Sequence, residues 1–171
     1  MITRLSFFSV VTVLILGVNA AAAQEAAATR NTISASTGSM NFDLSGTGNT
    51  WNVAVRGTRA LTSNLALEVG GLFARPELQG GIGTLILPEA QLQYHWRVGK
   101  VAPYAGGGVG FVHQRRDFIG STNNFALSAA GGARFYFNDR VAALGEFRLH
   151  TIERDFTGTT AEIMGGVSYA F

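Results

Sequence analysis

Hydrophobic and polar residues alternate with a period of two along almost the whole chain after residue 30. Alternate residues of a β-strand share one face, so the final stretch places Ile163, Val167, Tyr169 and Phe171 on one apolar face. Eight segments show this alternation and are separated by turn signals, which predicts eight strands. The predicted strands are residues 31–44, 50–61, 65–75, 84–97, 101–115, 124–137, 140–153 and 161–171.

The connections between these segments alternate in length. Three are tight and carry Asn, Asp or Gly for turn geometry, namely "LTSNL", "RVGKVAP" and "FNDRV". The other four are looser, namely "SGTGN", "RPELQGGIG", "RRDFIGSTNN" and "DFTGTT". An even number of strands with short turns at one end and longer loops at the other predicts an all-β, eight-stranded antiparallel up-and-down transmembrane β-barrel. Closure of the barrel removes the exposed strand edges.

Charged residues within the segments share one face, opposite the apolar one. A lipid-facing Arg costs about 2–4 kcal/mol at mid-bilayer, so we expect these charges inside the barrel. Eight strands enclose a space that side chains can just fill, which favours a plugged lumen. An ion path through the lumen is the alternative interpretation. The predicted lumenal charge network is Arg56, Glu68, Glu89, Arg134, Glu146, Arg148 and Glu162.

In segment 31–44 the alternation changes phase near Gly38, which allows a β-bulge there.

Aromatic and glycine positions add to this prediction. Aromatic residues gather toward the segment ends, which predicts one girdle at each membrane interface. The expected outer girdle is Trp51, Phe73, Phe111 and Phe125, and the expected periplasmic girdle is Trp96, Phe135, Phe137, Tyr169 and Phe171. The run "GGGVG" at 106–110 lies inside an alternating strand and is expected to make room for bulky lumenal neighbours.

The N-terminus predicts a signal peptide. Arg4 precedes an apolar run of 12 residues, "FFSVVTVLILGV", and the small residues of "NAAAAQ" supply a cleavage site after Ala23. The apolar run is too short to be a membrane-spanning helix. The predicted organisation is a signal peptide at 1–23, a short periplasmic lead at 24–30 and the barrel domain at 31–171.

Composition narrows the possible partners and cofactors. The chain has no Cys, so no disulfide is available to stabilise it. Its 13 basic and 11 acidic residues nearly balance, which makes nucleic acid an unexpected partner. The three histidines lie on different segments without ligand spacing, so no metal or other cofactor is predicted.

Three stretches, "VAPYAGGGVGF", "GGARFYFNDRVAALGEFRLH" and the terminal "GGVSYAF", resemble the small outer-membrane β-barrel family that includes the OmpA-type transmembrane domain, OmpX and OmpW. The resemblance implies export to the outer membrane of a Gram-negative bacterium. It also implies insertion by the barrel assembly machinery, which recognises a last strand ending in an aromatic residue. Val167, Tyr169 and Phe171 are therefore the expected assembly signal.

A structural or surface-interaction role for a monomer is the function that these features predict. Outer-membrane lipid and lipopolysaccharide are the expected partners, with solvated loop arginines as the alternative interpretation of the basic residues near the outer strand ends. Those possible lipopolysaccharide contacts are Arg75, Arg115, Arg116 and Arg154. Passage of small or hydrophobic solutes is the second possibility.

A lipid A-modifying enzyme is the third possibility. His150 and Glu162 resemble part of the Ser-His-Glu set of lipid A deacylases, but Ile152 occupies the position where that family carries its Ser. Without a nucleophile no catalytic residue is predicted.

Overall fold

The computed structural model describes residues 31–41, 48–78, 81–116, 120–152 and 159–171, and every described element is a β-strand. The predicted signal peptide and periplasmic lead lie outside these residues. The strands are β1 (Thr32–Asn41), β2 (Asn49–Ala60), β3 (Leu65–Ala74), β4 (Glu77–Leu78), β5 (Gly81–His95), β6 (Val101–Arg116), β7 (Gly120–Tyr136), β8 (Val141–Ile152) and β9 (Thr159–Ala170). No helix in the described ranges has the length and apolar character needed to cross a membrane.

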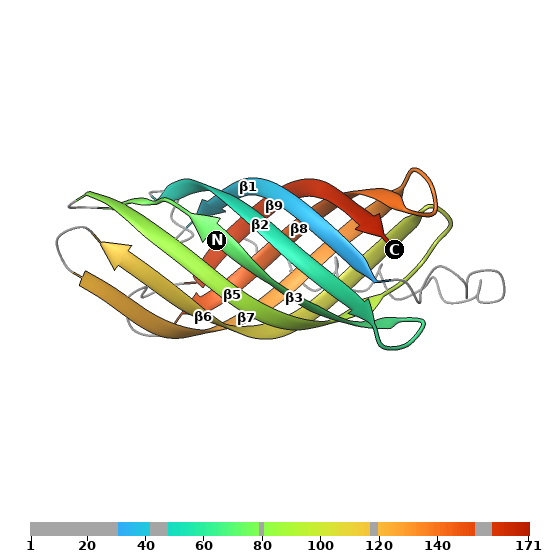
Figure 1. The fold of residues 1–171 in the computed structure, drawn as a ribbon, viewed down its shortest axis with the longest axis horizontal. Helices are drawn as coiled ribbons and strands as arrows, with labels where there is room; N and C mark the ends of the chain where they lie inside the picture. The colour runs from blue at the N-terminus through green and yellow to red at the C-terminus, as the bar shows by residue number, and fades with distance from the viewer. Residues whose placement is uncertain (1–30, 42–47, 79–80, 117–119, 153–158) are drawn as a thin grey trace, which may run out of the picture.

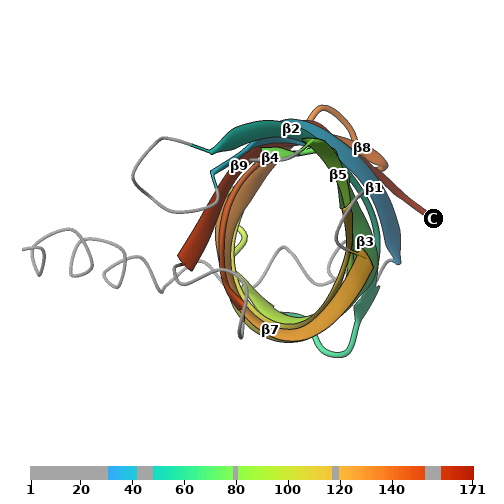
Figure 2. The ribbon, with the colours of Figure 1, turned by 90° about the vertical axis from the view of Figure 1, so that its left-hand side faces the viewer.

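The sheet closes on itself. Every strand pairs antiparallel with its neighbours in the order β3-β2-β1-β9-β8-β7-β6-β5, and a further pairing between β3 and β5 completes the ring. The two-residue β4 only extends the hairpin that leads into β5. Figure 2 shows the ring along the barrel axis. The predicted eight-stranded antiparallel barrel is confirmed, and closure leaves no long edge strand unpaired.

Short turns lie at one end of the barrel, which we call the short-turn end, at residues 61–64, 96–100 and 137–140. Their side chains explain their tightness: Asn138 Oδ1 accepts hydrogen bonds from the backbone N–H groups of Arg140 and Val141, both at 2.9 Å. Gly99 adopts a φ of 62°, a conformation that glycine permits without steric cost. Thr32 of β1 and Ala170 of β9 lie at the same end.

The strands β5, β6 and β7 extend beyond the others at the opposite, long-loop end (Figure 1). The stretch "RRDFIGSTNN" was expected to be a loose connection, but β6 continues to Arg116 and β7 begins at Gly120. That expectation was wrong mainly for β7, which begins four residues before the predicted 124, because its ladder runs through exposed polar residues such as Ser121 and Asn123 that show no hydrophobic alternation; β6 ends one residue beyond the predicted 115.

The bulge that the sequence allowed near Gly38 is also absent from the described ladder. Residues 32–41 pair without interruption with both β2 and β9. The inward residues of β1 change from Thr32, Ser34 and Ser36 to Met40 along one unbroken face. The apparent change of phase therefore reflects a change in the chemistry of the lumen from one end to the other.

The outer surface carries an apolar band between two groups of aromatic residues. Trp51, which is 74% exposed, and Phe111 lie toward the long-loop end, while Phe135 and Phe171 lie toward the short-turn end. Phe125 and Phe135 lie ten positions apart on β7 (125 to 135). At a rise of about 3.3 Å per residue and a tilt of about 40°, that spacing is about 25 Å along the barrel axis, the height of an outer-membrane apolar band.

The inner surface has three levels. Threonine and serine side chains line the short-turn end, and charged side chains fill the middle. The long-loop half contains an apolar cluster, which we call the apolar layer, made of Met40, Ala54, Leu72, Ala74, Leu85, Leu87, Val112, Ala126 and Met164. The lumen is therefore a packed core along much of its length, as the size of an eight-stranded barrel requires.

Candidate functional site

Arg148 is the centre of the charged level. It projects inward from β8, and its side chain is completely buried. Its Nε and Nη2 donate to the two carboxylate oxygens of Glu146 at 3.1 and 2.9 Å, and Nη2 also donates to Glu68 Oε1 at 2.8 Å. Nη1 donates to Glu89. One guanidinium thus binds carboxylates from β3, β5 and β8, using the planar set of donors that distinguishes Arg from Lys.

Arg56 of β2 enters the same level from the other side of the ring and shares the same carboxylates. Its Nη1 lies 3.3 Å from Glu146 Oε1, and its Nε lies 3.7 Å from both Glu68 and Glu89. Nη1 also donates to Ser36 Oγ at 3.3 Å. Two arginines and three carboxylates therefore form one connected cluster, in which no charge is left without an opposite neighbour.

Two residues that the sequence did not assign to the network also belong to it. Tyr104 donates its hydroxyl to Glu146 Oε2 at 2.6 Å. His150 lies between two carboxylates, with Nε2 at 3.3 Å from Glu89 and Nδ1 at 3.0 Å from Glu162, the latter outside hydrogen-bond geometry. His150 shares a face with Glu146 and Arg148 in the sequence, and that alternation was the available signal for its position.

The seven predicted network residues all face the lumen, but they do not form one set. Glu162 pairs with His150 and with no arginine in the described part of the chain. Arg134 lies closer to the short-turn end, and its Nη2 is 3.8 Å from Glu68 Oε2. The expected pairing of Glu162 with an arginine is thus not seen in the described residues: Arg148 is its ladder partner, but the Arg148 guanidinium donates to Glu68, Glu89 and Glu146 instead.

Glycines next to the large lumenal side chains make this packing possible. A Cβ on Gly132 would lie 2.6 Å from the Tyr104 hydroxyl, and one on Gly106 would lie 2.9 Å from Gln93 Cγ. Both distances are too short for a real methyl group. The expectation that "GGGVG" makes room for bulky lumenal neighbours is thus confirmed for the lumenal glycines of β6.

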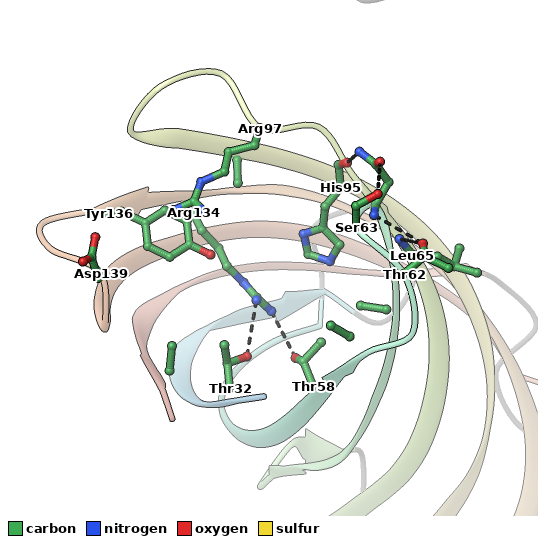
Figure 3. Close-up of a pocket in the computed structure, with 15 residues that line it drawn as sticks. Thr32, Thr58, Thr62, Ser63, Leu65, His95, Arg97, Arg134, Tyr136 and Asp139 are labelled. Carbon is green, nitrogen blue, oxygen red and sulfur yellow. Dashed lines mark hydrogen bonds between the residues drawn. The ribbon is translucent and has the colours of Figure 1, made fainter. Parts of the chain in front are cut away.

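A cavity opens at the short-turn end below the charged level (Figure 3). Arg134 extends into this region and donates to Thr32 Oγ1 at 3.3 Å and to Thr58 Oγ1 at 3.1 Å. His95 stacks on Tyr104 with ring centroids 5.2 Å apart. The sequence did not predict this pocket, because its walls come from strands far apart in the chain.

The residues expected to contact other molecules lie on the outside. Val167, Tyr169 and Phe171 of the expected assembly signal point outward, with exposures of 58%, 44% and 69%. Arg75 and Arg115 are exposed toward the long-loop end. Arg116 ends β6, but its side chain lies outside the described part, as does the whole of Arg154. In the described ranges, no group of three or more metal-binding side chains is placed to hold a metal ion.

Comparison with known proteins places the fold in a family. Neisserial surface protein A (NspA) is 16% identical, with a TM-score of 0.69 over 83% of this chain and 96% of its own. The N-terminal β-barrel domain of Pseudomonas aeruginosa OprF is 14% identical, with a TM-score of 0.57 over 82% of this chain and 97% of its own. The outer membrane enzyme PagL is 13% identical, with a TM-score of 0.54 over 80% of this chain and 97% of its own.

At these identities the structural likeness shows the fold alone, and no curated protein matches the sequence. The family described as "Outer membrane protein beta-barrel domain" matches residues 10–171, nearly the whole chain. The lipid-compatible outer surface, the polar and charged lumen and the closed ring of eight strands agree with that match. This chain therefore belongs to the outer membrane protein β-barrel domain family.

Proposed function

We propose that this protein is a non-conducting outer-membrane barrel with a structural or surface-interaction role. The observation that carries the proposal is the burial of the two central arginines. Arg148 and Arg56 are 0% and 2% exposed, although they lie in the middle of the lumen where a pore would need water. Side chains from β2, β3, β5, β6 and β8 meet there and occupy the cross-section.

The apolar layer gives the proposal independent support. Leu85, Leu87 and Val112 are completely buried and lie between the charged level and the long-loop end. A hydrophobic constriction opposes conduction because it excludes water. An ion that crosses the lumen would therefore have to pass the charged level, where each charge has an opposite neighbour, and the apolar layer, which offers it no water.

Measurements of ion current across a bilayer test this proposal. The protein, purified from membranes and reconstituted in planar bilayers, is expected to give no steady single-channel current. Heat-dependent gel mobility on the same sample checks that the barrel is folded, since a closed barrel resists SDS until it is boiled. Steady current steps from folded protein would refute the closed lumen and favour passage of small solutes.

Lipopolysaccharide is the surface partner that we propose. Above the Phe111–Phe125 pair, whose ring centroids are 5.7 Å apart, the outer face of β6 and β7 becomes polar. His113 lies 2.7 Å from Asn123, and Arg115 follows one ladder step further out. Outward cations just beyond an aromatic girdle lie at the level of lipid phosphates. Arg75, Arg116 and Arg154 remain candidates in the same proposal.

Phosphate analysis of the purified protein tests this partner. Arg115→Gln is expected to lower the amount of co-purified lipopolysaccharide. Arg59→Gln is the matched control, because Arg59 is exposed at the short-turn end of β2 and carries the same charge. Equal lipopolysaccharide on both variants would count against the contact.

A non-enzymatic role follows from the same packing. His150 and Glu162, the residues that suggested hydrolytic chemistry, are 1% and 0% exposed inside the lumen. A lipid ester in the outer leaflet has no route to them. We therefore propose no catalytic residue, and unchanged lipid A after expression of the protein in a host membrane is the expected result.

A further inference from the structure

The cavity at the short-turn end has the construction of a binding site. It measures about 60 Å³, and its wall includes Thr32, Thr58, His95, Arg97, Arg134 and Tyr136. A water molecule needs about 10–15 Å³ of such space, so the cavity holds about four to six oxygen-sized atoms. It faces the same side as the short turns, which is the periplasmic side in barrels of this family.

Aromatic rings hold the two arginines of the cavity in place. The guanidinium of Arg134 lies 5.6 Å from the centre of the Tyr104 ring, and that of Arg97 lies 4.5 Å from the centre of the Tyr136 ring. Arg134 is also fixed by its hydrogen bonds to Thr32 and Thr58 (Figure 3). A cation that is already positioned loses little side-chain entropy when it binds an anion.

Donors around the cavity remain unused. Arg134 is only 3% exposed, yet its Nε has no hydrogen-bond partner in the described part of the chain, and neither has Nε2 of His95. Thr32 accepts from Arg134 and keeps its own hydroxyl hydrogen as a further donor. Buried polar atoms without partners are costly, and an acceptor with several oxygens would satisfy these two once their side chains turn toward it, since both are covered in the empty cavity.

The charge around the cavity also favours an anion. Arg97 and Arg134 contribute two positive charges to the wall, and Asp139 contributes one negative charge. Glu68 lies 3.8 Å from Arg134 Nη2, but its Oε1 accepts a hydrogen bond from Arg148 at 2.8 Å. The side chains of the wall therefore sum to one positive charge, with the Thr32 hydroxyl beside it and with His95 Nε2 as a further donor in the tautomer that carries its hydrogen there.

We propose that this cavity is a binding site for one phosphate group, either free inorganic phosphate or the phosphate of a small soluble monoester. The donors approach from several strands and not from one plane, which suits a tetrahedral oxyanion better than a flat carboxylate. The cavity has room for the four oxygens of phosphate. In a monoester, the substituted oxygen would face the open side.

Calorimetric titration of the purified barrel in detergent tests the site directly. The probes are inorganic phosphate, glycerol 3-phosphate and acetate at constant ionic strength. We expect one phosphate per barrel with a dissociation constant of about 1 mM or lower. Acetate is expected to bind at least about tenfold more weakly, because it offers fewer oxygens to the charged donors. Binding of glycerol 3-phosphate in addition would identify monoesters as ligands, and its failure would assign the site to free phosphate.

Variants separate this site from general anion effects. Arg134→Gln is expected to weaken phosphate binding about tenfold or more, through loss of hydrogen bonds from a charged group. His95→Phe keeps a ring to stack on Tyr104 but removes Nε2, so it should weaken binding while the barrel stays folded. Arg59→Gln removes an equal charge from the exposed face of β2 and should bind as the wild type does. No phosphate binding at 50-fold the expected constant, equal binding by Arg59→Gln and His95→Phe, or equally tight acetate would overturn the proposal.

Discussion

Removal of the Glu146 carboxylate tests whether the charged level stabilises the barrel or only lines a water-filled channel. Glu146 accepts hydrogen bonds from Arg148 at 2.9 and 3.1 Å and from Tyr104 at 2.6 Å, and it is the nearest carboxylate to Arg56, at 3.3 Å. Glu146→Ala therefore deprives three buried groups of a partner at once. The two arginines retain some compensation, since Arg148 keeps its hydrogen bonds to Glu68 and Glu89 and Arg56 stays close to the same two carboxylates.

The expected loss in the free energy of unfolding can be estimated from the buried ion pair that is broken. Breaking a buried ion pair on one side costs about 3–5 kcal/mol, because an uncompensated charge stays in a poorly hydrated place. With a urea m-value of about 2 kcal/mol per M, the unfolding midpoint should fall by about 1.5–2.5 M. Glu146→Gln keeps an acceptor oxygen and most of the volume, so its midpoint should lie between those of Glu146→Ala and the wild type.

Urea titration of the protein in lipid vesicles provides the measurement. Asp139→Ala is the control, because Asp139 is an exposed carboxylate in the turn between β7 and β8 and exposed pairs contribute at most about 1 kcal/mol. If Glu146→Ala and Asp139→Ala had the same midpoint, the arginines would have to be hydrated in the folded state. That result would refute the reasoning from burial, and steady wild-type current would then be expected.

Three further predictions concern packing, membrane exposure and assembly. Gly132→Ala should lower stability by about 1–3 kcal/mol in urea titration, because its Cβ would meet the Tyr104 ring, whereas Gly145→Ala, with open space around its Cβ, should not; similar midpoints would argue against this lumenal packing. Ile163→Arg should destabilise the barrel in vesicles by about 2–4 kcal/mol relative to Ile163→Val, since Ile163 is 68% exposed on the lipid face; no difference would contradict the face assignment. Deletion of Phe171 should reduce outer-membrane levels in cells more than refolding yield in detergent, and equal losses would indicate a purely structural role for this residue.

The strands and their faces could be predicted from the sequence because both depend on a local period of two. Arg56, Arg134 and Arg148 alternate with apolar neighbours, and lipid excludes the reverse assignment. Prediction failed where outward residues become polar. The strand β7 begins at Gly120, four residues before the predicted start at 124, because Ser121 and Asn123 are exposed polar residues without the hydrophobic alternation that reveals strands.

The identity of the ion pairs could not be predicted, because it depends on how strand tilt brings distant positions to one level. Arg148 meets Glu89, which lies 59 residues away in the chain. The apolar layer was missed for another reason: in "TLILP" both faces are apolar, so alternation does not reveal that Leu85 and Leu87 point inward. The cavity at the short-turn end joins residues of seven strands and the turns, and no local pattern marks it.

The shared carboxylates have a consequence for how the barrel folds. Arg148 comes from β8, near the end of the chain, whereas Glu68 and Glu89, which it binds, come from β3 and β5. A partly built sheet that lacks β8 would hold the carboxylates of β3 and β5 without their main cation, in a membrane that penalises isolated charge. Intermediates in which the sheet has not yet closed are thus less stable than both the unfolded chain and the closed barrel. Folding should therefore be cooperative, with the first and second halves of the chain becoming stable together.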